Sequence, residues 1–186
     1  MLSFILYMQP RATLYRKFEI PKRHGGTREI WAPDKNLKLI QYRLANLLQN
    51  CVEEINTLHG HAEDETHHGI AHGFKRKHTI VTNARAHVTR RYVFNVDLHD
   101  FFGSINFGRV RGFFLKDRNF ALQPKTATVL AQIACFENKL PQGSPCSPVI
   151  SNLIGHALDI LLVRLATDTG CTYTRYADDL TFSTNK

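Results

Sequence analysis

The clearest helical pattern in the chain runs from Ser147 to Leu165, and it restricts the possible folds more than any other feature. Apolar side chains recur there at spacings of three and four residues, which places them on one face of a helix. They are Ile150, Leu153, Ile154, Ala157, Leu158, Leu161, Leu162 and Leu165. Ser147 followed by Pro148 is typical of a helix start. We therefore predict a long core helix that buries this apolar stripe.

Two β-hairpins are predicted near opposite ends of the chain. In residues 16–33, two β-prone runs flank Gly25-Gly26, and glycines can adopt the positive φ that a tight turn needs. The second hairpin is YTRYADDLTFS, Tyr173–Ser183. Its turn is predicted to be Ala177-Asp178-Asp179.

A third strand and several helices are predicted between the hairpins. Residues 92–98 alternate as a strand, and Asp97 leaves it on the face opposite the apolar side chains. These apolar side chains are Phe94, Val96 and Leu98. Further helices are predicted to begin near Asp34, Thr79, Asn106 and Pro124. The order of elements indicates an α+β protein with helices packed on one face of an antiparallel sheet.

Charge and cysteine usage narrow the functional classes. The 186 residues carry a net charge of +8, which favours a polyanionic partner such as nucleic acid; a merely soluble basic protein is the alternative. The four cysteines are scattered, without a CxxC pair, so neither a zinc site nor a disulfide framework is indicated. The short apolar run near Met1 is far below the roughly 20 residues that span a bilayer. A cytoplasmic protein without a membrane partner is expected.

Residues 56–78 are rich in histidine and are predicted to form a loop. The histidines are His59, His61, His67, His68, His72 and His78. A metal site and a polar surface loop are the alternatives. The spacings match no known ligand pattern, so the loop is favoured.

The acidic residues Asp97, Asp178 and Asp179 need an explanation, because adjacent carboxylates repel each other and Asp is depleted in strands. A solvated turn is one interpretation of the doublet alone. Divalent cations would compensate the charge, since Mg²⁺ prefers oxygen ligands and binds through one or two carboxylates plus substrate phosphates. Two such ions about 4 Å apart support an in-line displacement at phosphorus.

These acidic residues lie in motifs that resemble those of reverse transcriptases. YADD, Tyr176–Asp179, is similar to the catalytic box of that family, and NVDLHDFFGSI, residues 95–105, resembles its first aspartate motif. LPQGSPCSPVISN, residues 140–152, is similar to the nucleotide-site motif, and FEIPK with GGTREI resembles the fingers hairpin. AHGF, NARAH and TRYADDLTFS point to the bacterial retron-type branch. The resemblance runs from about Tyr15 to the end of the chain.

The resemblance implies a right-hand polymerase with fingers and an antiparallel palm sheet. Residues 1–91 would be mainly fingers, with the hairpin at 16–33. Residues 92–186 would be mainly palm, with fingers helices interleaved around 107–140. Together they would form one reverse transcriptase domain that is incomplete at its C-terminus. The thumb is expected to lie outside this chain, on a continuation of it or on a second polypeptide.

The resemblance also implies roles for particular residues. Asp97, Asp178 and Asp179 would bind two Mg²⁺ ions, with Mn²⁺ as a substitute, and the carbonyl of Leu98 could add a ligand. Asp97 and Asp178 would bridge both ions. Phe102 matches the steric gate against a ribose 2′-hydroxyl, with Phe101 as the alternative. The incoming nucleotide would be lined or gripped by Lys22, Arg28, Gln142 and Gly143. Asn83 and His87 would either contact RNA or form a buried polar pair, and the structural role is preferred.

The implied function is RNA-directed DNA polymerisation of the retron kind. Such an enzyme copies a structured noncoding RNA into single-stranded DNA (msDNA), starts from a 2′-hydroxyl of that RNA, and serves in antiphage defence. Its partners would be the noncoding RNA template and primer, the DNA product, dNTPs and an associated effector protein. The alternatives are a group II intron-like or abortive-infection reverse transcriptase, which the AHGF and NAxxH signatures disfavour, and a noncatalytic RNA-binding subunit.

Overall fold

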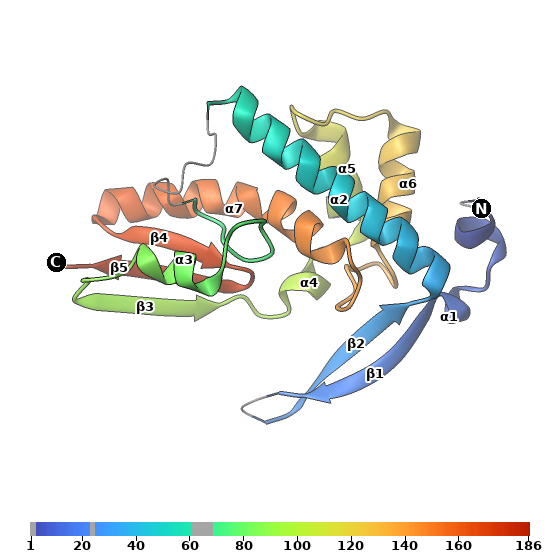
Figure 1. The fold of residues 1–186 in the computed structure, drawn as a ribbon, viewed down its shortest axis with the longest axis horizontal. Coiled ribbons are helices and arrows are strands. Elements are labelled where there is room, and N and C mark those ends of the chain that lie inside the picture. The colour runs from blue at the N-terminus through green and yellow to red at the C-terminus, as the bar shows by residue number, and fades with distance from the viewer. Residues whose placement is uncertain (1–2, 23–24, 61–68) are drawn as a thin grey trace. The chain divides into compact units, whose positions relative to one another are not determined.

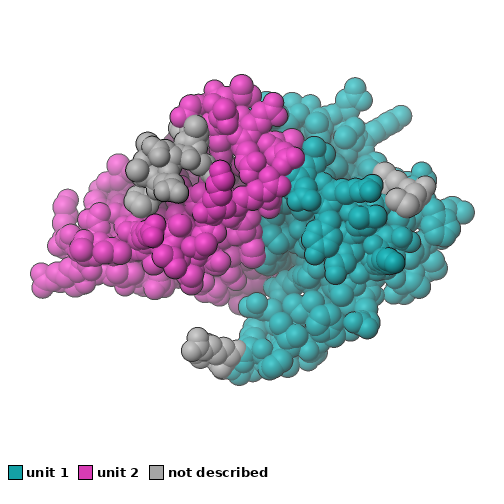
Figure 2. Space-filling model, in the orientation of Figure 1, with its two compact units in different colours: residues 1–47, 102–150 teal, residues 48–101, 151–186 magenta. Residues whose placement is uncertain are grey.

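The computed structural model describes residues 3–22, 25–60 and 69–186, and it divides into two compact units (Figure 2). Unit 1 comprises residues 1–47 and 102–150, and unit 2 comprises residues 48–101 and 151–186. Residues 48–91, which the sequence analysis assigned mainly to the fingers, thus cluster with the strand that ends at Asp97. Helices and antiparallel sheets are present in the mixture predicted for an α+β protein (Figure 1).

Unit 1 holds the N-terminal hairpin and most of the shorter helices. Its elements are η1 (Phe4–Met8), α1 (Arg11–Leu14), β1 (Tyr15–Pro21), β2 (Thr27–Pro33), the start of α2 (Lys35–Leu58), most of α4 (Phe101–Ser104), α5 (Phe107–Lys116), α6 (Pro124–Ala134) and the start of α7 (Ser147–Thr169). The predicted hairpin is confirmed, because β1 and β2 pair antiparallel from Tyr15 opposite Pro33 to Pro21 opposite Thr27.

Helix starts in unit 1 follow the capping signals of the sequence. Asp34 accepts a hydrogen bond from the Leu37 amide at 3.0 Å and so caps α2. Asn106 accepts one from the Arg109 amide at 2.9 Å and caps α5. Pro124 occupies the first turn of α6, where its missing N–H costs nothing. All three predicted starts are confirmed.

The core of unit 1 joins the base of the hairpin to α2. Its buried apolar residues are Ile5, Leu14, Tyr15 and Leu37, with Trp31, Ile40 and Phe136 packed against them. Gln41 is fully buried there and donates to the Tyr15 hydroxyl at 2.7 Å and to the Ile133 carbonyl at 2.8 Å. One side chain of α2 thus connects the hairpin to α6.

Unit 2 is built on a three-stranded antiparallel sheet. Its elements are the remainder of α2, α3 (Ile80–Arg85), β3 (Tyr92–Asp97), Phe101 of α4, most of α7, β4 (Thr172–Tyr176) and β5 (Asp179–Thr184), and the strand order is β3-β5-β4. The β4–β5 hairpin was predicted to have a three-residue turn, which is one residue too long. Asp179 already belongs to β5, where it pairs with Tyr176, so the turn is Ala177-Asp178.

Helices cover both faces of this sheet, which corrects the prediction of a single covered face. On one face Tyr173, Leu180 and α7 residue Ala166 form the core, and the Tyr173 hydroxyl donates to Asp159 of α7. Thr174 and Ser183 point to the other face, where His87, just beyond α3, hydrogen-bonds both hydroxyls. The prediction failed because α3 is short and carries too few apolar residues to show which surface it covers.

Helix α7 buries only part of the predicted apolar stripe, since Ile150 is fully buried and Leu162 packs against the core. Leu161 and Leu165, members of that stripe, are 60% and 53% exposed, whereas Asp159 is only 2% exposed. Ala166 also faces the core. The reason is that α7 holds a buried ion pair described below, which a count of apolar residues cannot detect. Among the described helices α7 alone has the length and composition to cross a membrane, but its packing on the sheet is that of a core helix.

The apolar face of β3 is only partly buried. Val96 and Leu98 pack against the core as predicted, but Phe94 is 66% exposed. The strand lies at an edge of the sheet, as the strand order shows, and Phe94 is farther from the Asp97 end. The alternation therefore predicted the faces of β3 correctly and the extent of its burial incorrectly.

Candidate active site

Three aspartates meet at one end of the sheet in unit 2. Asp97, the last residue of β3, lies directly opposite Asp179, the first residue of β5, and Asp178 precedes it in the turn. The Leu98 amide donates to the Asp178 carbonyl at 3.0 Å and ties the end of β3 to the turn. Asp97 and Asp179 are on the face opposite α7, because side chains alternate along each strand. We call these three residues the acidic cluster.

The acidic cluster is electrostatically unfavourable as it stands. Burial raises the pKa of Asp179 above its ordinary value, and the carboxylates of Asp178 and then Asp97 raise it further. Within residues 3–22, 25–60 and 69–186, no cation forms an ion pair with any of the three. The negative charge of the acidic cluster is therefore not compensated by a neighbouring Arg or Lys.

The donor chemistry of the acidic cluster fits a hard divalent cation. All its side-chain donors are carboxylate oxygens, which Mg²⁺ prefers, and Mg²⁺ commonly takes its remaining ligands from water and substrate phosphate. Across the described part of the chain, no three His, Cys, Asp or Glu side chains are arranged as a ready metal site. The acidic cluster could hold a cation whose remaining ligands come from water and a substrate.

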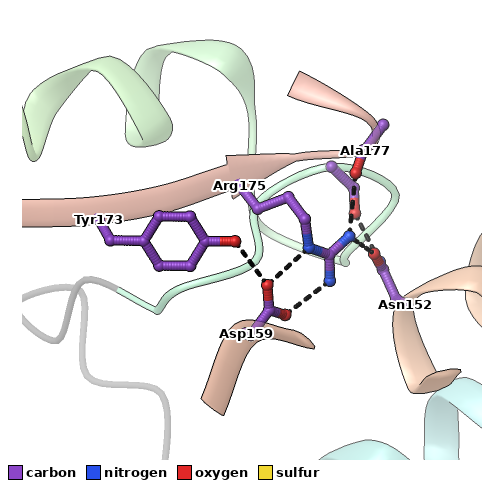
Figure 3. Close-up of polar contacts among 6 residues, drawn as sticks. Asn152, Asp159, Tyr173, Arg175 and Ala177 are labelled. Carbon is purple, nitrogen blue, oxygen red and sulfur yellow. Dashed lines mark hydrogen bonds and ion pairs between the residues drawn. The ribbon is translucent and has the colours of Figure 1, made fainter. Parts of the chain in front are cut away.

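Directly behind the turn lies a buried polar network, which the sequence analysis did not identify (Figure 3). Arg175 is fully buried, and its Nε and Nη2 donate to the two carboxylate oxygens of Asp159 at 2.8 and 2.7 Å. Its Nη1 donates to Asn152 and to the Ala177 carbonyl, both at 3.0 Å. Tyr173 donates to Asp159 at 2.9 Å. We call Arg175, Asp159, Asn152 and Tyr173 the buried network.

A sequence signal for the buried network does exist. Asn152, Gly155 and Asp159 are spaced three and four residues apart, so they share one face of an otherwise apolar helix. A Cβ on Gly155 would lie 3.1 Å from Nη2 of Arg175, so the glycine leaves room for the guanidinium. A buried cation in β4 needs a carboxylate partner, and this polar face provides it. The apolar stripe gave no indication of this polar face.

In unit 1 the hairpin presents two cations on one face. Strand register places Arg28 opposite Ile20, and Lys22 lies two residues beyond Ile20, so all three side chains share a face. The Lys22 amide donates to the Gly26 carbonyl at 3.0 Å and continues the pairing into the turn. Both cations are exposed. They are therefore accessible to an anionic ligand.

The Pro-Gln-Gly loop packs against the same hairpin. The Gln142 carbonyl accepts a hydrogen bond from the Trp31 amide at 2.7 Å. Gly143 has φ +110°, and a Cβ there would lie 2.8 Å from a methyl of Ile30 and 2.9 Å from the Trp31 carbonyl, so only glycine fits. Ile30 pairs with Phe18 and shares the face of Arg28 and Lys22. Gln142 and Gly143 therefore lie against the strand that carries Arg28.

The adjacent phenylalanines differ in burial. Phe101 is 7% exposed, and the Arg175 guanidinium lies 5.9 Å from the centre of its ring. Phe102 is half-buried. Phe101 belongs to unit 2 and Phe102 to unit 1. Of the two, Phe101 has the environment of a packing residue, which leaves Phe102 as the better candidate for contact with a substrate.

Asn83 and His87 are both buried. The two ring nitrogens of His87 hydrogen-bond Ser183 at 2.6 Å and Thr174 at 2.7 Å. Burial, and then the charge of Arg90, lower the pKa of His87, which favours the neutral ring. Since both nitrogens are engaged, this geometry favours a structural role for His87 over contact with RNA.

The histidine-rich stretch is described only in part. Its members His61, His67 and His68 lie outside the described residues. His59 bonds the Ile55 carbonyl at 2.8 Å, His72 bonds Thr82 at 2.8 Å, and the ring of His78 lies 5.0 Å from that of His72. His59 is exposed as expected for a polar surface loop, but His72 is buried, which the prediction of a surface loop did not anticipate.

Comparisons with known proteins show the family of the chain. Residues 20–186 match the family described as "Reverse transcriptase (RNA-dependent DNA polymerase)". The chain is 39% identical to the retron Mx162 reverse transcriptase of Myxococcus xanthus, over 94% of this chain and 36% of that protein. It is 33% identical to the retron Ec86 reverse transcriptase of Escherichia coli, over 91% of this chain and 48% of that protein. It is 35% identical to the retron Ec73 reverse transcriptase of Escherichia coli, over 91% of this chain and 53% of that protein.

The chain therefore spans between about a third and about half of the length of these relatives. The family match covers the fingers-hairpin motif from Ile20, the strand ending at Asp97, the Pro-Gln-Gly loop and the hairpin of the acidic doublet. Those four segments are the ones on which the resemblance was based. The chain belongs to the reverse transcriptase (RNA-dependent DNA polymerase) family, and the relatives that it matches are retron reverse transcriptases.

Proposed function

We propose that this chain carries the fingers and palm of a retron reverse transcriptase that copies a structured noncoding RNA into single-stranded DNA (msDNA). The observation that carries the proposal is the placement of Asp97 opposite Asp179, with Asp178 in the adjoining turn. Unit 2, which holds this acidic cluster, would be mainly palm. Unit 1, which holds the β1–β2 hairpin, would be mainly fingers.

In this proposal the acidic cluster holds two Mg²⁺ ions, or Mn²⁺ in their place. When bound, the ions activate the 3′-hydroxyl of the primer and stabilise the departing pyrophosphate. Asp97, Asp178 and Asp179 would hold them, with the Leu98 carbonyl as a further ligand. The raised pKa of Asp179 means that its charged form is disfavoured relative to an isolated carboxylate, and bound cations would offset that cost.

Residues of unit 1 bind and select the nucleotide. Arg28 suits bidentate contact with a triphosphate oxygen pair, and Lys22 acts as a point charge on the same face of the hairpin. Gln142 and Gly143 line the nucleotide beside that hairpin. Phe102 excludes a ribose 2′-hydroxyl by steric contact, which selects dNTPs over ribonucleotides.

The partners are inferred from the resemblance to retron enzymes. We infer a noncoding RNA that serves as template and supplies a priming 2′-hydroxyl, dNTPs as substrates, and an effector protein in antiphage defence. The net charge of +8 supports the nucleic-acid part of this set. The same charge also fits a noncatalytic RNA-binding subunit, which is the second candidate.

Primer extension distinguishes the two candidates. The protein, completed by the segment that supplies the thumb, is mixed with the RNA of its own locus, Mg²⁺ and dNTPs. The control is the Asp178→Asn/Asp179→Asn double variant. We expect DNA from the wild type and none from the variant, with equal RNA binding. If the wild type binds RNA but makes no DNA, the polymerase proposal fails and the RNA-binding subunit remains.

A further inference from the structure

We propose that Arg175 is a positioning residue for the catalytic turn Ala177-Asp178, and that Asp159, Asn152 and Gly73 hold it in place. The inference rests on the proposed function, since it concerns the geometry of the acidic cluster. None of these four residues touches the substrate in this account. They act through the backbone that carries Asp178.

The turn needs external support because its backbone is strained. Ala177 has φ +59°, in the left-handed region that residues with a Cβ avoid. The first central position of a two-residue hairpin turn with this conformation is normally glycine. A residue keeps such a conformation only where contacts with its surroundings hold it, and such residues are concentrated at functional sites.

Arg175 holds the turn from the side of α7. Its Nη1 donates to the Ala177 carbonyl at 3.0 Å, while Nε and Nη2 are fixed by both oxygens of Asp159. The planar guanidinium therefore connects the helix rigidly to the residue that precedes Asp178 (Figure 3). Because the Asp159 carboxylate neutralises it, Arg175 serves as a spacer and not as a counter-ion for the acidic cluster.

Tyr173 completes the coordination of Asp159. Its hydroxyl donates to Oδ1 of Asp159 at 2.9 Å. Burial, reinforced by the Asp159 charge, raises the pKa of Tyr173, so the hydroxyl stays protonated and remains a donor. The carboxylate thus accepts three hydrogen bonds in a buried setting. This arrangement fixes the position of Arg175.

The loop before α3 supports the turn from the edge of β4. Residues 70–72 pair with Arg175 through its backbone: the Arg175 amide donates to the Ile70 carbonyl, and the His72 amide donates to the Arg175 carbonyl, both at 2.8 Å. Gly73 follows, and a Cβ there would overlap the Ala177 amide nitrogen and lie 3.0 Å from the Tyr176 carbonyl carbon. Only glycine permits this approach of the two backbones.

Asn152 joins the two supports. Its side-chain amide donates to the Gly73 carbonyl at 2.6 Å, and its oxygen accepts from Nη1 of Arg175 at 3.0 Å. The loop, α7 and the turn are therefore linked through one side chain. Movement of the turn would reach Asp97 as well, because the Leu98 amide donates to the Asp178 carbonyl.

Two variants perturb these supports while leaving the buried ion pair intact. Gly73→Ala pushes directly on the Ala177 backbone, and Asn152→Asp keeps the acceptor for Arg175 but cannot donate to the Gly73 carbonyl. The matched control is Gly112→Ala on α5, where an added Cβ meets nothing within 4 Å. Neither variant alters a residue of the acidic cluster.

The test measures Mn²⁺ binding by electron paramagnetic resonance, alongside the Mg²⁺ midpoint, kcat and dNTP KM of the completed enzyme. Supporting residues around a metal site typically change affinity or activity by about 10- to 100-fold. We expect Gly73→Ala to unfold at a lower temperature than the wild type, because the added Cβ overlaps the Ala177 backbone, and Asn152→Asp to be affected less. In the folded state both variants should weaken Mn²⁺ binding, raise the Mg²⁺ midpoint about tenfold, and lower kcat with little change in dNTP KM. Gly112→Ala should match the wild type in every measurement.

Folded variants with unchanged Mn²⁺ affinity and unchanged Mg²⁺ midpoint would overturn the positioning role. If Gly73→Ala does not fold, Asn152→Asp decides the question alone, and an effect on dNTP KM without one on metal binding also overturns it. The proposed function fails separately, when the wild type makes no DNA or binds Mn²⁺ independently of Asp178. Because metal binding is measured without turnover, the two failures are distinguishable.

Discussion

Two groups of charged residues lie on either side of the β4–β5 turn, and they handle charge in opposite ways. In the buried network every charge has a partner: Arg175 pairs bidentately with Asp159, which also accepts from Tyr173. In the acidic cluster, carboxylates face carboxylates, and none has a cation among the described residues. Only Tyr176 and Ala177 lie between Arg175 and Asp178 in the chain.

This difference separates structure from function. A satisfied buried pair stabilises one conformation, because removal of either partner leaves an uncompensated charge. A group of like charges without a cation costs stability, and such groups are concentrated at functional sites. We therefore expect the buried network to hold the conformation and the acidic cluster to take part in the reaction. Each of the following predictions tests this division.

The largest expected effect is on activity. Asp178→Asn removes a ligand of the proposed cations but no protein contact of its side chain, so it should lower kcat by about 10³-fold or more while the unfolding temperature changes little. Single-turnover DNA synthesis and thermal unfolding are measured on the same preparation. Retention of most of the activity would show that the acidic cluster is not catalytic.

The next effect is on stability. Arg175→Met or Asp159→Leu leaves a buried partner charge and should cost about 3–5 kcal/mol of unfolding free energy, measured by urea denaturation. The double variant Arg175→Met/Asp159→Leu removes both charges and should lose less than the sum of the two single variants. A loss below about 1 kcal/mol in either single variant would mean that the pair does not hold the fold.

The neighbouring phenylalanines extend the comparison to substrate choice. Phe102→Val should raise ribonucleotide incorporation about tenfold or more, because the ring no longer excludes the 2′-hydroxyl. Phe101→Ala should leave discrimination unchanged and instead destabilise the fold by about 3–5 kcal/mol, since Phe101 is buried. Competition between dNTPs and rNTPs measures the first effect. Relaxed discrimination in Phe101→Ala alone would move the gate to Phe101.

The smallest effect is a gain in stability. Asp179→Asn removes one of two like charges directly opposite each other on paired strands and should stabilise the apo protein by about 0.2–1 kcal/mol at neutral pH. The pKa of Asp179 is higher in the folded state than in the unfolded state, where it is about 3.9. Ionisation of Asp179 therefore begins to cost stability as the pH rises through the unfolded pKa, and the cost is complete once the pH has passed the folded pKa.

The advantage of Asp179→Asn over the wild type should therefore be absent at pH below about 3.9 and complete well above it. Urea unfolding at several pH values measures this difference. A destabilised Asp179→Asn variant at pH 7, or a difference that does not vary with pH, would show that the acidic cluster is not strained by its own charge.

The sequence predicted the parts of the fold that depend on local chemistry. Asp34 and Asn106 mark helix starts because their side chains cap the first turn, and Gly25-Gly26 marks the hairpin because glycine tolerates positive φ. Alternation in β3 also placed Asp97 on the face away from Val96. These signals act over a few residues, so the sequence displays them directly.

What the sequence did not reveal depends on contacts between distant residues. Asp159 of α7 is buried against Arg175, which is 16 residues away along the chain, whereas the apolar residues Leu161 and Leu165 are exposed. His87 covers the second face of the sheet through Thr174 and Ser183, 87 and 96 residues away. Apolar periodicity carries no information about such polar pairings.

The candidate site divides in the same way. The motifs predicted the acidic residues Asp97, Asp178 and Asp179, whose meeting at one sheet end follows from strand register. They did not predict that Gly73 and Asn152 support the turn, because that requires the path of the loop beside β4. Supporting residues of this kind become visible only when the backbone is placed.

The most direct test of the central claim is Mg²⁺-dependent incorporation of one dNTP opposite an RNA template by the completed enzyme and by its Asp97→Asn variant. Thermal unfolding is followed on the same samples. The account predicts incorporation by the wild type, none by Asp97→Asn, and an unfolding temperature for the variant that equals or exceeds that of the wild type. Incorporation at the wild-type rate by a folded Asp97→Asn protein would contradict it.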